Sequence, residues 1–347
     1  MFKISLPELG WKPFFQQQIA LEEAGSHFAV RIVAQHRSQV VTWGAYGEQV
    51  LPIALLHKLA EVTVGDWLLI NRNNQRPTRL LQRQTLIRRK AAGPAAATQL
   101  IAANLDTLFI VSSCNSEFNP ARLERYLSVA LEAGVLPVVV LTKADLCDDV
   151  AHYQRRAAKL RSGLLVECVN ALDQTTLEGV SAWCRPGQTI ALLGSSGVGK
   201  STLAGALGVS GLATGEVRAD DQKGRHTTTR RSLHRLPQGG LILDTPGMRE
   251  LQLADCEDGV NALFEDVLVD SPCRFSDCTH TTEPGCAVQQ AVANGELDSR
   301  RLHSYQKLLA EQRRNRETLA EKRQRLKTLG KTYKRIKEVS QQQKNKH

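Results

Sequence analysis

Residues 189–207 read TIALLGSSGVGKSTLAGAL, and this stretch decides how the rest of the sequence is interpreted. It predicts a strand over residues 189–193 and a helix over residues 202–207. Between them, GSSGVGKS at residues 194–201 matches the phosphate-loop pattern G-x-x-x-x-G-K-[ST], and a preceding strand and a following helix are the context that this pattern requires. The alternative is a chance loop rich in Gly and Ser. In this context the motif predicts a nucleotide-binding site.

The residue types of this loop suit phosphate binding. Glycines allow backbone N–H groups to turn inward around phosphate groups, and the positive end of the following helix dipole adds to the attraction. We expect Lys200 to reach the β- and γ-phosphates and to take part in catalysis, and Ser201 to bind Mg²⁺.

A second motif, LDTPG at residues 243–247, follows another short apolar strand. Asp244 is placed to hold Mg²⁺, and the Gly247 N–H to contact the γ-phosphate and sense its loss. Between the two motifs lies GRHTTTRR, residues 224–231, in which a threonine hydroxyl could complete the Mg²⁺ shell. We assign this role to Thr228, and either neighbouring threonine is an alternative.

The sequence LTKAD at residues 141–145 favours guanine over adenine. It follows an apolar strand and resembles the N/T-K-x-D loop of GTPases, with Thr142 in place of the commoner Asn. The carboxylate of Asp145 would accept from guanine N1–H and the 2-amino group; adenine lacks both donors, so the acid would be left unpaired. The stem of Lys143 would lie across the nucleotide. Residues 168–171, CVNA, end another strand and resemble the loop whose backbone contacts guanine O6.

These guanine loops precede the phosphate loop, which reverses the usual order of GTPase motifs. A circular permutation explains the order, because every loop still projects from the carboxyl end of a parallel strand. The residues that we expect to bind GTP are Thr142, Lys143, Asp145, Asn170, Ala171, Gly194, Ser195, Ser196, Gly197, Val198, Gly199, Lys200, Ser201, Thr202, Asp244 and Gly247. The expected magnesium ligands are Ser201, Thr228 and Asp244.

Alternating strands and helices predict an α/β fold with a parallel sheet and helices on both faces. Before it, short β-branched runs indicate a small barrel such as an OB-fold, although an SH3-like barrel would read the same way. The predicted order is an N-terminal extension (1–26), an RNA-binding barrel (27–90), a linker (91–97), the permuted GTPase domain (98–255), a zinc-binding helical domain (256–328) and a disordered basic tail (329–347).

The charge of the chain is distributed unevenly over its 347 residues. Residues 300–347 hold 16 Lys and Arg against 4 Asp and Glu, and residues 1–97 hold 12 against 6, whereas residues 98–299 are acidic. Basic ends suggest contact with a polyanion, and a solvated basic tail is the alternative. No apolar run approaches the ~18 residues of a membrane span, and the start does not resemble a signal peptide, so we expect a cytoplasmic protein with no membrane contact.

The permuted motifs, followed by Cys273-x₄-Cys278-x-His280-x₅-Cys286, resemble the ribosome small-subunit-dependent GTPase A family (RsgA, also called YjeQ). The resemblance covers residues 28–309. It implies an OB-fold that contacts ribosomal RNA, a permuted GTPase domain and a zinc-binding C-terminal domain. It also implies a role in late maturation of the small (30S) subunit, with 16S rRNA as partner, GTP and GDP as ligands, and hydrolysis stimulated by the subunit. The long basic C-terminal extension and the absence of a strongly basic leader depart from the family pattern.

The sequence has eight cysteines, and because the cytosol keeps thiols reduced we expect no disulfide framework. Cys273, Cys278, His280 and Cys286 form a Cys₃His set able to close a tetrahedral, structural Zn²⁺ site. Their spacing alone leaves open whether they bind metal or are reduced cysteines in a loop. The family resemblance implies one Zn²⁺ per chain.

In many GTPases a glutamine directly after D-x-x-G orients the attacking water. In this sequence Met248 occupies that position. A thioether cannot orient the attacking water. His226 is the nearest titratable candidate, and the resemblance points to the same residue; an ordinary surface histidine is the alternative.

We expect a monomeric enzyme that acts as a ribosome-assembly GTPase. An alternative is an RNA-binding assembly module in which nucleotide is a regulatory ligand with negligible turnover. A large-subunit assembly GTPase is disfavoured by the barrel before the GTPase domain and the cysteine cluster after it.

Overall fold

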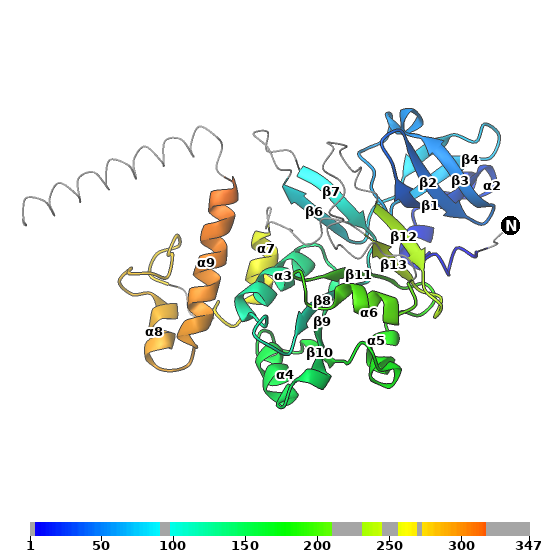
Figure 1. Cartoon of the computed structure of the whole chain (residues 1–347). Helices are drawn as coiled ribbons and strands as arrows, with labels where there is room; N and C mark the ends of the chain where they lie inside the picture. The colour runs from blue at the N-terminus through cyan, green and yellow to red at the C-terminus, as the bar shows by residue number, and fades with distance from the viewer. Residues whose placement is uncertain (1–3, 91–97, 210–230, 245–255, 269–272, 317–347) are drawn as a thin grey trace, which may run out of the picture.

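An N-terminal β unit and a C-terminal helical unit lie on opposite sides of a central α/β domain (Figure 1). A computed structural model of the chain describes residues 4–90, 98–209, 231–244, 256–268 and 273–316. Eleven strands form one sheet, and two further strands pair separately.

The central domain is built on five parallel strands, as predicted. They are β8 (Thr107–Ser113), β9 (Leu136–Thr142), β10 (Leu165–Cys168), β11 (Thr189–Leu193) and β13 (Leu241–Asp244). In space their order is β10-β9-β8-β11-β13, and every adjacent pair is parallel. Their carboxyl ends therefore meet at one edge of the sheet. A sixth strand, β12 (Arg231–Arg235), pairs antiparallel with β13.

Helices cover both faces of this sheet, which explains why its strands are apolar on both sides. In β8, Leu108 and Ile110 belong to the same buried cluster as residues of α3 (Pro120–Glu132) and α4 (Val150–Ala158). The alternate residues Phe109 and Val111 belong to a second cluster with α5 (Glu178–Ser181) and α6 (Lys200–Ala206). The predicted helices on both faces are confirmed. α6 begins at Lys200 rather than at the expected residue 202, immediately after Gly199 with its φ of 91°.

The N-terminal β unit contains the short strands that the sequence predicts. It consists of β1 (His27–Gln35), β2 (Gln39–Gly44), β3 (Gly47–Pro52), β4 (Trp67–Asn71) and β5 (Pro77–Leu80), all antiparallel. The short helices α1 (Pro13–Gln16), α2 (Leu21–Ser26) and η1 (Ile53–Leu56) complete it. A side chain at Gly65, before β4, would overlap the carbonyl of Ala103, so this turn requires glycine.

Strand pairing crosses the predicted division between the barrel and the GTPase domain at two places, and the domain boundaries otherwise stay predictions. β6 (Leu86–Lys90), assigned to the barrel, pairs with β7 (Thr98–Ala103), assigned to the GTPase domain. The second crossing joins the two units into one sheet, because Ala34 of β1 pairs with Ser232 of β12. The β1–β12 contact links segments about 200 residues apart, so local patterns do not reveal it.

The C-terminal unit packs on α3 through α7 (Glu257–Leu263) and α9 (Ser299–Arg316), with α8 (Ala287–Ala293) farther out (Figure 1). A Cβ at Gly259 of α7 would overlap the backbone of α3, so glycine permits this close approach. Arg301 of α9 donates to the buried carboxylate of Glu124 at 3.3 Å and to Asp266 at 2.6 Å. Of the helices described, none combines the length and apolar character needed to cross a membrane.

Arg31 is a buried charged residue at the junction of the N-terminal unit with the central domain, where it is 1% exposed. Its Nη1 donates to Leu9 O at 2.5 Å and to Thr189 Oγ1 at 2.8 Å, and its Nη2 donates to Asn104 O at 2.8 Å. Its Nε donates to Gly65 O at 3.3 Å. Burial lowers the pKa of Arg31 to about 10, a shift that the carboxylate of Asp106 opposes. The guanidinium therefore stays charged at neutral pH and joins four separate segments.

Replacing Arg31 by methionine should reduce the free energy of unfolding by about 3 kcal/mol, because three carbonyls and the Thr189 hydroxyl would lose a buried partner. Urea unfolding measures this change. The matched control is Arg37→Met, at an exposed position after the same strand. Equal stability of the two variants would contradict the assigned role of Arg31.

Candidate functional site

The phosphate-loop motif has the backbone that its sequence predicts. It leaves β11 at Gly194, where a Cβ would overlap Val111 O, and Gly197 and Gly199 have φ of 79° and 91°. The Nζ of Lys200 donates to Gly194 O at 2.7 Å and also to Ser195 O. Lys200 is thus folded over the loop that carries it, with its ammonium group among the carbonyls rather than pointing to solvent.

The predicted base loop lies against the phosphate loop. Thr142, the last residue of β9, is buried, and its Oγ1 donates to Val198 O at 2.6 Å, with Ser112 O 3.0 Å away. Lys143 follows with φ of 58°, and its Nζ donates to Gly197 O at 3.0 Å. The two motifs, separated by about 50 residues in the sequence, therefore touch at one edge of the sheet.

The remaining base-loop residues lie beside this contact. Asp145, in η2 (Ala144–Leu146), is exposed. Asn170 and Ala171 follow β10, and the preceding Val169 N–H donates to Leu141 O at 2.8 Å, which holds that loop next to β9. The Asn170 carbonyl also accepts from Thr176 Oγ1 at 2.8 Å, just before η3 (Gln174–Leu177) ends.

The predicted magnesium ligands are described only in part. Ser201 is in the first turn of α6, and Asp244 is the last residue of β13, the strand that pairs with β11 on the side away from β8. Both residues therefore belong to the same edge of the sheet as the phosphate loop. Thr228, His226 and Gly247 lie outside the described residues, so their roles stay predictions.

Arg122 is a residue of this site that the sequence reasoning missed. It lies in the first turn of α3, and its Nη1 donates to the hydroxyl of Ser195 at 2.5 Å. No motif marks this arginine. The available signal was topological: α3 follows β8, and β8 neighbours β11 in a permuted GTPase sheet, so the start of α3 comes near the phosphate loop.

The four residues of the predicted metal site converge in the C-terminal unit. The distances are 3.8 Å from Cys273 Sγ to Cys286 Sγ, 3.5 Å from Cys273 Sγ to His280 Nδ1, and 3.4 Å from Cys286 Sγ to His280 Nδ1. With Cys278, all four ligand atoms lie within 4.8 Å of one another. A tetrahedral ion with Zn–S of about 2.3 Å and Zn–N of about 2.0 Å separates its ligands by about 3.5–3.8 Å. The cluster is consistent with a closed zinc site.

The rest of the C-terminal unit supports this geometry. Gln289 of α8 and Gln306 of α9 both donate side-chain N–H groups to the His280 carbonyl, at 2.6 and 2.5 Å. The Glu283 carboxylate accepts from the Thr279 hydroxyl and from the backbone N–H groups of Thr279 and Thr281. These bonds, chiefly that from the Thr279 hydroxyl, lower the pKa of Glu283.

The other cysteines do not form a comparable set. All eight cysteines are free of disulfides, and burial raises the pKa of Cys114 and of Cys184 to about 12. Those thiols therefore remain protonated at neutral pH. Within the part of the chain that the structure describes, the Cys273, Cys278, His280 and Cys286 group is the one set of side chains close enough to hold a metal, as predicted.

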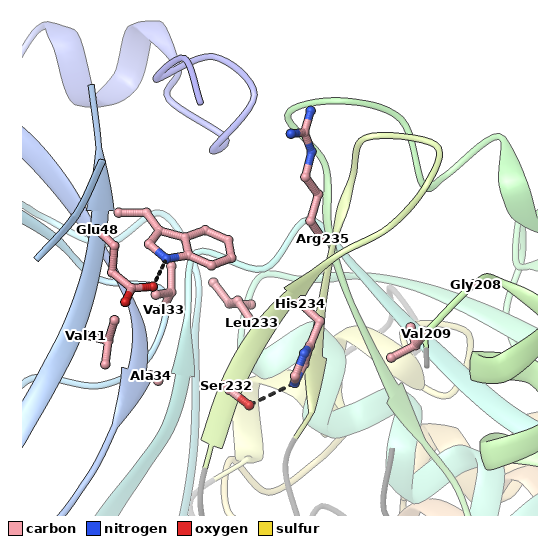
Figure 2. A pocket seen from close by; sticks show the side chains of 11 residues that line it. Val33, Ala34, Val41, Glu48, Gly208, Val209, Ser232, Leu233, His234 and Arg235 are labelled. Atoms are coloured by element: carbon pink, nitrogen blue, oxygen red, sulfur yellow. Dashed lines mark hydrogen bonds between the residues drawn. The ribbon is translucent and has the colours of Figure 1, made fainter. Parts of the chain in front are cut away.

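A separate pocket of about 390 Å³ lies where the N-terminal unit meets β12 (Figure 2). His234 and Ser232 face each other on β12 with 2.9 Å between Nε2 and Oγ, and Glu48 of β3 lies across from them. The described residues that line this pocket include none of those predicted to bind GTP, so it is distinct from the nucleotide site.

The fold and the converging loops define a circularly permuted P-loop GTPase. The family model described as RsgA GTPase matches residues 80–254. A model of ABC transporters also matches, over residues 177–346, which is less than half of the chain. That range contains the phosphate loop, a motif that ATP-binding proteins share with GTPases.

Relatives of known name agree with this class over nearly the whole chain. "Small ribosomal subunit biogenesis GTPase RsgA 2" of Vibrio parahaemolyticus is 53% identical over 316 residues, which are 90% of this chain and 87% of the relative. The corresponding RsgA of Mesorhizobium japonicum is 45% identical and covers 90% of this chain and 91% of its own. The chain therefore belongs to the RsgA GTPase family, and it is a GTP hydrolase.

Solved structures agree on the fold. The crystal structure of YjeQ from Thermotoga maritima has a TM-score of 0.61 and 25% identity, covering 82% of this chain and 98% of that one. The structure of YloQ, described as a circularly permuted GTPase, has a TM-score of 0.58 and 23% identity, covering 84% and 96%. The predicted permutation is confirmed.

Proposed function

We propose that this GTPase binds the small ribosomal subunit in the cytoplasm and assists its late maturation, with 16S rRNA as part of the contact surface. The names and coverage of the relatives support this role. The observation that carries the nucleotide site is the direct contact of Thr142 and Lys143 with the phosphate loop, because it brings base and phosphate recognition together.

Within this site, the Asp145 carboxylate accepts from guanine, and the stem of Lys143 covers the base. Lys200 leaves its loop carbonyls for the β- and γ-phosphates when GTP binds. Ser201 and Asp244 hold Mg²⁺, which supplies charge neutralisation at the transferred phosphoryl group. Asp244 ends a strand adjacent to β11, which supports its assignment.

Three residues outside the described part of the chain, His226, Thr228 and Gly247, are assigned from the sequence motifs alone. Thr228 is the third magnesium ligand, Gly247 contacts the γ-phosphate, and His226 positions the attacking water once the subunit has docked. Order–disorder of such a loop is an established way to couple a γ-phosphate to a partner.

In the C-terminal unit, Cys273, Cys278, His280 and Cys286 bind one Zn²⁺ per chain. The ligand separations support this assignment, and a closed Cys₃His set is structural rather than catalytic. The ion would hold the loop between Cys273 and Cys286, which contains few apolar residues, against α8 and α9.

Asp145→Asn should weaken GTP binding and increase the relative affinity for xanthine nucleotide, because an amide no longer accepts both guanine donors. A loss of about tenfold in GTP affinity is about 1.4 kcal/mol. Binding of fluorescent GTP and XTP analogues measures the preference. Asp148→Asn, at an exposed acid three residues on, is the control. An unchanged preference for GTP in Asp145→Asn would refute the base-loop assignment.

Cys286→Ser should reduce bound zinc from one ion per chain to almost none, because removing a thiolate opens the four-ligand site. Elemental analysis of purified protein gives the metal content. Cys147→Ser removes a cysteine that lies outside the cluster and should keep its zinc. Purified parent protein that contains no zinc and is unaffected by chelators would end this proposal.

His226→Ala should lose most of the turnover that small subunits stimulate while keeping GTP affinity and subunit binding, since only transition-state positioning is removed. Free protein should hydrolyse GTP slowly, on the order of the 10⁻⁴–10⁻² s⁻¹ of unassisted Ras and Gα. Hydrolysis with and without subunits, and cosedimentation with separated subunits, measure these properties. His234→Ala, on β12, is the matched histidine control.

Two results would count against this proposal. Full stimulated turnover in His226→Ala would show that another group positions the attacking water and that His226 has no catalytic role. Absence of both cosedimentation and stimulation with small subunits would overturn the ribosomal role while leaving the GTPase assignment intact.

A further inference from the structure

Arg122 connects α3 to the phosphate loop. Its guanidinium donates to Ser195 Oγ at 2.5 Å and lies 3.6 Å from the Glu117 carboxylate, and its side chain is 37% exposed. The helix start is fixed by Asn119, whose Oδ1 accepts from the Arg122 backbone N–H at 3.1 Å. The arginine is therefore held at a defined place beside the second residue of the loop.

Ser195 is bonded from two directions. Its hydroxyl accepts from Arg122, and its carbonyl accepts from Lys200 Nζ. Lys200 must exchange that carbonyl for phosphate oxygens when a nucleotide binds. Whatever orients Ser195 therefore influences both the shape of the loop and the resting position of its lysine.

The same helix is clamped by the C-terminal unit. The buried Glu124 carboxylate accepts from Arg300 at 3.1 Å and Arg301 at 3.3 Å, both in α9. Arg125 forms an ion pair with Glu311, and Glu132 accepts from a backbone N–H of α7 at 2.8 Å. These contacts begin two residues beyond Arg122.

A small cleft lies between α3 and α9, with a volume of about 180 Å³. Arg122 and Arg125 line it from α3, and Ser304 and Lys307 line it from α9. The residues of α3 that α9 contacts, Glu124 and Arg125, lie within one helical turn of Arg122. A shift of α9 on α3 would therefore change the surroundings of the Arg122 side chain.

We propose that Arg122 is a positioning residue of the phosphate loop, which acts through Ser195 and makes nucleotide binding sensitive to the seating of the C-terminal unit on α3. Arg122 bonds Ser195 of the loop, and α9 holds Glu124 and Arg125, the neighbouring residues of the same helix. This inference rests on the proposed placement of GTP at the phosphate loop. It does not depend on the ribosomal partner, so free protein suffices to test it.

The first test is a double-mutant cycle with Arg122→Ala and Ser195→Ala. GDP and GTP affinities are measured with fluorescent analogues, and kcat and KM by phosphate release. Each single variant should lose about tenfold in affinity, equivalent to about 1.4 kcal/mol. The double variant should lose no more than either single one, because the two side chains act as one unit. Losses that multiply, or no loss in Arg122→Ala, would overturn the proposal.

Three further variants separate positioning from a general structural role. Arg122→Lys retains a donor and should recover part of the lost affinity, whereas Arg155→Ala, on the exposed face of α4, should bind as the parent does. Lys200→Ala should abolish tight binding. If Lys200→Ala binds normally, the proposed nucleotide site itself is wrong; if only Arg122→Ala binds normally, the present inference alone fails.

The link to the C-terminal unit has its own readout. Arg125 lies three residues after Arg122 in α3. Arg125→Ala removes the ion pair with Glu311 of α9 and changes no residue of the phosphate loop. It should lower nucleotide affinity several-fold in the parent but not in the Arg122→Ala background. Equal effects in both backgrounds would show that α9 does not act through Arg122.

Discussion

The parallel pairing of β11 with β8 is the contact on which the functional site depends. Residues 190–193 pair with residues 107–110, although β9 and β10 come between them in the chain. This pairing brings the phosphate loop to the edge at which β8 and β9 end, so one hydroxyl, that of Thr142, reaches both Ser112 O and Val198 O. A permutation changes which strands are consecutive but not which strands are neighbours, and the site depends only on the neighbours.

The N-terminal unit is joined to this core by backbone pairing and by one buried charge. β1 continues the central sheet through β12, and Arg31 bonds the segment before β1, the chain after β7 and Thr189 at the start of β11. The cost of burying a guanidinium is offset because its donors meet fixed acceptors and the carboxylates of Asp106 and Asp66 favour its charge. Sliding of the β unit over the GTPase domain would break these bonds.

The C-terminal unit is held on the opposite side of the molecule by apolar packing of α7 and α9 on α3 and by ion pairs between α9 and α3, rather than by a shared sheet (Figure 1). α3 lies between that unit and the phosphate loop, with buried Glu124 facing α9 and Arg122 facing Ser195. At the far end of the same unit, Gln289 of α8 and Gln306 of α9 donate to the His280 carbonyl, next to the Cys₃His cluster. A large partner that contacts both the β unit and the C-terminal unit would therefore hold the nucleotide site from two sides.

The sequence alone determined the phosphate loop, the base loop, the Cys₃His set and most helices and strands, because each is a contiguous motif or period whose chemistry is local. The family followed from the order of these motifs. Only the tertiary structure decided that β6 pairs with β7, that β1 joins β12, and that Arg31 and Arg122 matter. β6 and β7 are close in the sequence but are separated by the segment interpreted as a linker, whereas the partners of β1 and of the two arginines lie tens of residues or more away. An isolated arginine in a sequence looks the same whether it is solvated or buried against carbonyls. Contacts between side chains that are distant in the sequence depend on how the whole chain packs, and no short segment of sequence specifies that packing.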